Sequence, residues 1–103
     1  MTTRNIEIAN TILAQMGGNC FIAMTGAKYL VAIENGLQFK LPARFAAKGI
    51  NCVQITLEPS DTYKMKFLKI RGIECKEISE IQGVFFDQLQ EFFTEKTGLN
   101  SYL

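Results

Sequence analysis

The sequence predicts a single α+β domain over residues 1–103: an N-terminal helix, an antiparallel meander of about five strands and a C-terminal helix. Three observations predict this order. Residues 51–71 contain two arms that alternate apolar and polar residues around a Pro59-Ser60-Asp61 break, which is typical of two half-buried strands and a turn. Apolar residues recur at helical spacing in residues 4–16 and again in residues 85–97. A length of 103 residues fits one domain.

The first helix is expected to cover Arg4–Met16, with Thr2 or Thr3 as its cap. Gly17-Gly18-Asn19 follows and is expected to end it, because glycine tolerates the left-handed conformation common at helix ends. One stripe of the helix is apolar, and it consists of Ile6, Ala9, Leu13 and Met16, widened by Ile8 and Ile12.

Three strands are expected next. The apolar runs Cys20–Met24 and Tyr29–Ile33 are expected to pair through a four-residue turn, Thr25–Lys28, in which Gly26 supplies a positive φ. Asn35-Gly36 then predicts a type I′ hairpin into Leu37–Leu41. Along that strand the alternation places apolar residues inward and the polar pair, Gln38 and Lys40, outward.

The rest of the chain continues the meander and closes it. Residues 43–50 form the longest connection, either a short helical turn or an open loop. After the central pair, Ile73–Ile81 is expected to be an edge strand, whose glutamates would discourage pairing with other chains. Phe85–Thr97 predicts a helix that seals the core with its phenylalanines and stops at Gly98. Both helices are expected on one face of the sheet, leaving the other face to solvent.

The composition disfavours several kinds of chemistry. Histidine is absent, which removes the commonest general base and the commonest metal ligand. Three cysteines match no metal or redox spacing, and the Gly26-Ala27-Lys28 run lacks the ending of a phosphate-binding loop. We therefore expect no enzyme, cofactor or metal. The lack of a signal peptide or apolar span predicts a cytoplasmic protein without a membrane partner. Cys52 and Cys75 lie in apolar-patterned segments, so we expect them to be buried, inert thiols.

Charge is distributed unevenly along the chain. The net charge is only +1, but residues 1–71 hold nine basic and four acidic groups, whereas residues 72–103 hold two basic and six acidic groups. Two interpretations stay open. The opposite charges balance each other within the molecule, or a basic sheet lies beside an acidic C-terminal segment.

The solvent-facing side of the sheet is the candidate site. Strand alternation points Lys40, Lys64 and Lys66 outward, and a bulge near Phe67–Leu68 is expected to swap the faces of that strand. Lys69 and Arg71 would then extend the basic strip, with Lys28 and Arg44 on nearby loops. The expected partner is a nucleic-acid backbone or an acidic protein; the alternative is a merely solvated face. Stacking recognition of RNA is disfavoured, because the outward set lacks aromatic residues. The candidate residues are Lys28, Lys40, Arg44, Lys64, Lys66, Lys69 and Arg71.

Several stretches together resemble a family of small uncharacterised proteins from bacterial phages, plasmids and other mobile elements. They are Gly17-Gly18-Asn19, Phe21–Lys28, Ile55-Thr56-Leu57, Asp61-Thr62-Tyr63, Asp87-Gln88-Leu89 and Phe93–Leu99. The resemblance spans most of the chain and implies a bacterial cytoplasm and a role in mobile-element biology, without an activity or binding residues.

Three function classes follow. The first is a non-enzymatic binding module that docks an anionic partner. The second is a protein–protein inhibitor or adaptor acting on a host defence complex. The third, a small enzyme, would depend on Lys28 or a cysteine. The sequence leaves the oligomeric state open.

Overall fold

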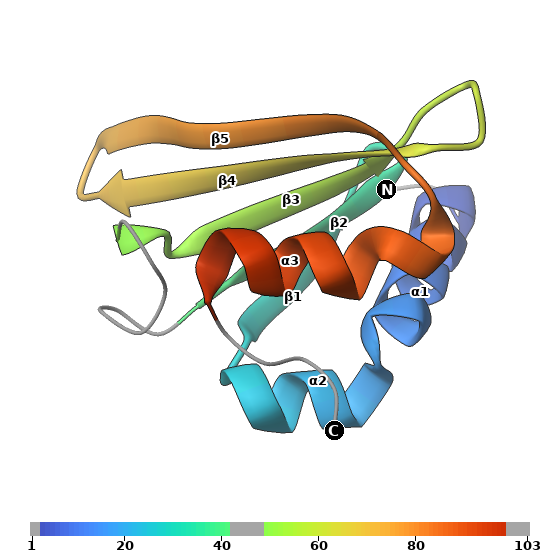
Figure 1. Ribbon diagram of the computed structural model, residues 1–103, viewed down its shortest axis with the longest axis horizontal. Coiled ribbons are helices and arrows are strands. Elements are labelled where there is room, and N and C mark those ends of the chain that lie inside the picture. Colours follow the sequence, from blue (N-terminus) through green and yellow to red (C-terminus); the bar gives the residue numbers. More distant parts are fainter. Residues whose placement is uncertain (1–2, 42–48, 99–103) are drawn as a thin grey trace.

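A computed structural model describes residues 3–41 and 49–98, and it has the predicted α+β order. Helix α1 (Thr3–Met16) is followed by a second helix, α2 (Gly18–Thr25). Five strands come next, and they are followed by the short 3₁₀ helix η2 (Phe86–Gln88) and helix α3 (Leu89–Thr97). The helices lie together on one side of the sheet (Figure 1). No helix in the described part of the chain is long and apolar enough to cross a membrane.

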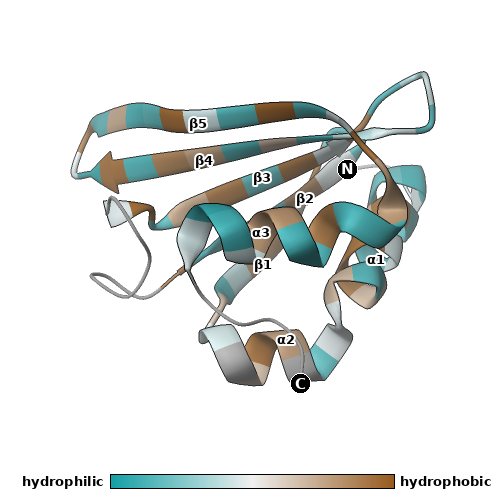
Figure 2. Ribbon diagram, viewed as in Figure 1, coloured by the Kyte–Doolittle hydropathy of each residue, from teal (hydrophilic) through white to brown (hydrophobic). Residues whose placement is uncertain are grey.

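The sheet is an antiparallel meander in which spatial order equals chain order, as predicted. Every neighbouring pair of strands is connected in sequence, so each can form by local pairing. Apart from the apolar run at residues 29–33, hydrophilic and hydrophobic residues largely alternate along the strands (Figure 2). The strands are β1 (Lys28–Ile33), β2 (Gly36–Lys40), β3 (Cys52–Leu57), β4 (Tyr63–Arg71) and β5 (Glu74–Val84).

The strand expected at Cys20–Met24 was a wrong prediction, because this segment lies in helix α2. A short apolar run fits a buried strand and a buried helix equally well, so tertiary contacts decide between them. Here the helix places Phe21 in the core with no exposed surface. Gly26 has the expected positive φ of 71°, but it caps a helix, since its N–H donates to the carbonyl of Ile22. The Thr25–Lys28 turn therefore joins a helix to β1 instead of joining two strands.

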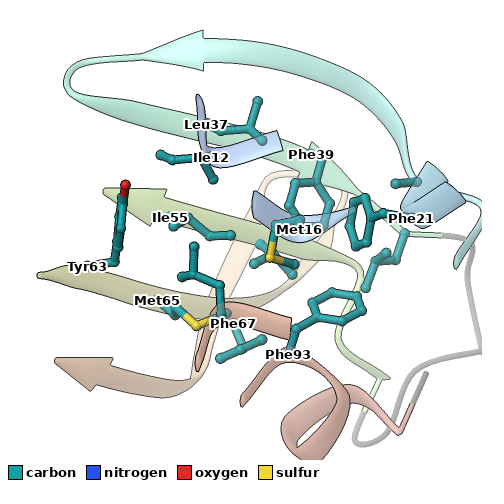
Figure 3. Close-up of a cluster of buried hydrophobic side chains, with 14 of the residues drawn as sticks. Ile12, Met16, Phe21, Leu37, Phe39, Ile55, Tyr63, Met65, Phe67 and Phe93 are labelled. Atoms are coloured by element: carbon teal, nitrogen blue, oxygen red, sulfur yellow. The ribbon is translucent and has the colours of Figure 1, made fainter. Parts of the chain in front are cut away.

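The core fills the space between the inward face of the sheet and the helices. Phe21 of α2, Phe39 of β2 and Phe93 of α3 meet there edge to face or tilted, with ring centroids 5.2–6.0 Å apart. Figure 3 shows their rings pointing toward one another beside Met16 of α1. Each of these four side chains has no exposed surface. The inward residues predicted for β2, β3 and β4 join the same cluster, as do Ile12 and Leu89.

Only two of the four phenylalanines predicted to seal the core from the C-terminal helix contact it. Phe93 is buried and Phe92 packs against the core, but Phe85 and Phe86 are 57% and 62% exposed. The reason is that β5 continues to Val84 and Phe85 keeps an extended backbone, so the α-helix begins four residues later than expected. The helical spacing that aligned Phe85 with Leu89 therefore does not apply.

The hairpin between β1 and β2 is confirmed, but its turn is not the predicted type I′. Ile33 pairs with Gly36, so Glu34 and Asn35 form the turn, and only Asn35 of these has a positive φ (55°). Gly36 already belongs to β2 and is needed for another reason. A Cβ at this position would lie 2.2 Å from the carbonyl oxygen of Ile55 on β3. Glycine here permits close approach of two backbones.

The bulge predicted near Phe67–Leu68 is present, but it does not swap the faces of β4. Phe67 pairs with Ser79 and Leu68 with Glu77, so the extra residue is Ile78 of β5. Pairing of β4 with β3 stays in register through Leu68. Because successive residues alternate, Lys64 and Lys66 lie on the open face, whereas the two basic residues after Leu68 fall on the helix-covered side. The predicted continuous strip that includes Lys69 and Arg71 is therefore wrong.

Candidate functional site

Basic side chains gather at one end of the sheet and extend over both of its faces. This end is where β1 and β5 begin, β2 ends, β3 begins and β4 ends (Figure 1). The width from β1 to β5 is four strand spacings, or roughly 19 Å. We call this surface the basic end and define it by Lys28, Lys40, Lys69, Arg71 and Lys76.

Two pairs of lysines lie directly opposite each other across neighbouring strands at the basic end. Lys28 of β1 pairs with Lys40 of β2, and Lys69 of β4 pairs with Lys76 of β5. Like charges in directly opposed positions destabilise a sheet, each by up to about 1 kcal/mol. None of these four lysines has an ion pair with another described residue. Glu74 is directly opposite Arg71 at the same end, so the five cations of the basic end lie beside a single described carboxylate on the strands there.

Tyr29 adds an exposed aromatic ring to the basic end. It is the extra residue of a bulge in β1, because Lys28 pairs with Lys40 and Val31 with Gln38. Its φ of 55° is uncommon for a bulky residue, and its side chain is 72% exposed. The Lys40 Nζ lies 5.7 Å from the centre of the ring, in reach of a cation–π contact. The prediction that the outward set lacks aromatic residues is thus corrected.

The end of β4 is held in place by Asn51, which lies just before β3. Its side-chain amide donates to the carbonyl of Ile70 and its side-chain oxygen accepts from the Ile70 N–H, both at 2.8 Å. These bonds continue the β3–β4 pairing beyond the last strand pair, at Leu68. They fix the backbone that carries Lys69 and Arg71. The same end of the β4–β5 hairpin has a shallow hollow lined by Lys69, Arg71, Glu74 and Lys76.

Lys64 and Lys66 share the open face with Lys40, as predicted, but they lie among acidic groups. The Lys64 Nζ is 3.9 Å from a carboxylate oxygen of Glu58, and the Lys66 Nζ is 4.0 Å from one of Glu77. Glu80 is directly opposite Lys66. A hydrogen bond from Gln82 lowers the pKa of the Glu80 carboxyl, and Lys64 and Lys66 act in the same direction. The middle of the open face is therefore a mixed-charge surface.

The structure does not bring the seven predicted site residues together on one surface. Lys28 and Lys40 meet on the open face of the basic end, and Lys69 and Arg71 lie at the same end on the opposite face. Lys64 and Lys66 lie in the mixed-charge middle. Arg44 is outside the described residues. Sequence reasoning missed two residues at this end of the sheet: Lys76, a member of the basic end, and Tyr29, whose ring lies beside Lys40.

One of the two missed residues had a detectable signal. The arms on either side of Gly72-Ile73 place Lys69 and Lys76 at equal distances from the turn, so a hairpin register would have paired them. Tyr29 had no such signal, because its exposure depends on a bulge inside a short apolar strand.

The two described cysteines differ in environment. Cys52 lies between Lys40 and Leu68 in the register of the sheet and has no exposed surface. Burial raises the pKa of its thiol, and Lys40 partly offsets this effect. Cys75 is exposed, which corrects the prediction of a buried thiol, because it lies near the start of the edge strand β5.

A thiol-labelling experiment checks this difference. At pH 7.5 we expect a maleimide to modify Cys75 at least tenfold faster than Cys52, because reaction needs an accessible thiolate. Peptide mass mapping measures the labelling rate of each thiol, and equal rates in native buffer would contradict the burial of Cys52.

The raised pKa of the Cys52 thiol also makes the stability of the fold depend on pH. Its contribution to the free energy of unfolding is fully present below the unfolded pKa, about 8.5, and is lost as pH rises through the higher folded value.

The described residues offer no group of three or more His, Cys, Asp or Glu side chains that could hold a metal ion. No protein-family model, curated protein or solved structure matches the chain. The arguments that follow therefore start from the geometry of the basic end.

Proposed function

We propose that the chain is a non-enzymatic binding module of a phage or other mobile element, which docks an anionic partner at the basic end in the bacterial cytoplasm. One observation carries the proposal: two opposed lysine pairs, Lys28 with Lys40 and Lys69 with Lys76, occur at the same end of the sheet. A bound polyanion would relieve the repulsion in both pairs at once. The mobile-element origin is supported by the sequence resemblance alone.

A nucleic-acid backbone suits this surface because the cations follow the end of the sheet over both faces. Lys28 and Lys40 lie on the open face, and Lys69 and Lys76 lie on the other. Lys69 is two strand spacings, roughly 10 Å, from Lys40, and Lys76 is three spacings, roughly 14 Å, from it. An extended strand of phosphates can contact both groups in turn. The exposed ring of Tyr29 offers a base a stacking partner, which favours single-stranded nucleic acid over a duplex.

Salt dependence of binding tests the proposal. We expect the full chain to bind a fluorescein-labelled oligothymidylate, measured by fluorescence anisotropy, and binding to weaken with added NaCl. Four phosphate contacts predict a slope of log K against log [NaCl] of about −3, which is roughly a fiftyfold loss between 50 and 200 mM. The absence of binding at 50 mM NaCl, to this oligonucleotide and to an acidic polypeptide such as polyglutamate, would overturn the proposal.

The second candidate function is a protein–protein inhibitor or adaptor acting on a host defence complex. The exposed pair Phe85 and Phe86 favours it, because aromatic residues are enriched at protein interfaces. Capture from a nuclease-treated bacterial lysate separates the two functions. A partner protein that is retained after nuclease treatment and lost in a Phe85→Ser, Phe86→Ser variant supports the adaptor.

A further inference from the structure

The exposed side of helix α3 carries negative charge and ends in two exposed aromatic rings. Asp87, Glu91 and Glu95 recur every four residues, so they form one ridge along η2 and α3, and all three are exposed. Phe85 and Phe86 precede this ridge, with more than half of each side chain exposed. We call these five residues the acidic face. No described basic residue forms an ion pair with this face.

The acidic face has a counterpart in the basic end of the same chain. The basic end combines its cations with two exposed apolar side chains, Tyr29 at 72% and Ile73 at 103% exposure. Ile73 lies in the turn between β4 and β5, two residues after Arg71 and directly before Glu74. Each surface therefore presents two exposed apolar residues flanked by charges, and the charges of the two surfaces are opposite in sign.

The two surfaces cannot meet through these apolar residues within one molecule. Strand β5 begins at the basic end with Glu74 and runs for 11 residues to Val84. Phe85 and Phe86 therefore lie at the opposite end of the sheet, roughly 30 Å from Ile73. Figure 1 shows the β4–β5 turn and the start of α3 at opposite sides of the molecule. Contact of Phe85 and Phe86 with Ile73 therefore requires two copies.

We propose that a second copy of this chain docks its acidic face on the basic end of the first, giving a head-to-tail assembly. Charge complementarity favours this occupant, because both halves of the contact are present on every molecule. The contact is heterologous, so each copy keeps one free basic end and one free acidic face. Such an assembly grows with concentration into a ring or an open filament, and a closed dimer through one shared patch is not expected. This inference does not depend on the proposed anionic partner.

Sedimentation velocity of the full chain tests the assembly. At 50 mM NaCl we expect the weight-average sedimentation coefficient to rise between 10 μM and 1 mM protein, and to fall to the monomer value at 500 mM NaCl. A Phe85→Ser, Phe86→Ser variant is expected to remain monomeric at both salt concentrations. Ile6→Ser is the matched control, because Ile6 is an exposed apolar residue on α1, outside both surfaces, and it should associate as the wild type does.

Two variants with one blocked surface each identify the contact. Lys28→Glu with Lys76→Glu blocks the basic end, and Glu91→Lys with Glu95→Lys blocks the acidic face; all four residues are exposed. Each variant alone is expected to be monomeric. Mixed one to one, they are expected to form a species of twice the mass of one chain that does not grow further, because each supplies the surface that the other lacks.

Three outcomes would overturn the head-to-tail contact. The first is a wild-type chain that stays monomeric at 1 mM in 50 mM NaCl. The second is association of either blocked variant alone to the wild-type extent. The third is a mixture that forms no heterodimer. Circular dichroism spectra that match the wild type establish that each variant is folded, so a loss of association reports on the surfaces.

Discussion

Replacing Phe93 with alanine is expected to lower the free energy of unfolding by about 3–5 kcal/mol. Phe93 has no exposed surface, and its ring contacts Phe21 at a centroid distance of 5.2 Å and Phe39 at 6.0 Å. These rings come from three separate elements, α3, α2 and β2, so no single local movement can refill the space. The variant loses apolar burial and leaves a cavity where the helices meet the sheet. Urea denaturation followed by circular dichroism measures the change.

Phe85→Ala is the matched control for Phe93→Ala. It removes the same atoms from the same short segment, but the Phe85 side chain is 57% exposed. We expect a loss of less than about 0.5 kcal/mol. A comparable loss for both variants would mean that Phe85 belongs to the core, as the helical pattern of the sequence alone suggested, and would contradict the start of α3 at Leu89.

Much of the fold was predictable because β3 and the first part of β4 keep a two-residue period. Val53, Ile55, Met65 and Phe67 are inward in the sequence pattern and buried in the structure. The turn residues between β3 and β4 and the Asn35-Gly36 signal placed the hairpins correctly. Helix α1 followed from its apolar stripe, although Ile6 at its start remains 47% exposed.

The wrong predictions occur where two periods compete or where an element boundary shifts. Cys20–Met24 is too short for its period to distinguish helix from strand, and the core position of Phe21 decides in favour of helix. At the C-terminal end, Phe85 and Phe86 fit a helical stripe only if the helix begins at residue 85. The length of β5 moves that start, and strand length depends on pairing with β4, which local sequence does not encode.

The sequence showed that basic residues are abundant in the strands, but it did not show which of them share one surface. The excess of lysines in β2 and β4 is visible in the sequence, whereas the faces they occupy depend on the register. Leu68 stays in register with Cys52, so Lys69 and Arg71 leave the open face. Glu58 and Glu77 come from a turn and from β5, and they neutralise Lys64 and Lys66 only after folding.

Removing the two open-face lysines of the basic end is expected to weaken anion binding strongly. In a Lys28→Gln, Lys40→Gln variant, the loss of two phosphate contacts predicts roughly fiftyfold weaker binding of oligothymidylate at 50 mM NaCl. The slope of log K against log [NaCl] is expected to become less negative by about 1.4. Both side chains are exposed, and their removal relieves a like-charge pair, so the fold should not be weakened.

The matched control is Lys64→Gln, Lys66→Gln. It lowers the net charge by the same amount, from +1 to −1, and it changes the same open face of the sheet. These lysines already interact with Glu58 and Glu77, so we expect them to contribute little to binding an external anion. Their removal is expected to change the affinity by less than about threefold, an effect of net charge at a distance.

The ratio of these two affinities, measured by anisotropy on the same oligonucleotide at 50 mM NaCl, tests the central claim most directly. A binding surface at the basic end predicts that the Lys64→Gln, Lys66→Gln variant binds at least tenfold more tightly than the Lys28→Gln, Lys40→Gln variant. Equal affinities would mean that only net charge matters. The reverse order would place the anion in the middle of the sheet, and either result would contradict the claim that the basic end is the docking surface.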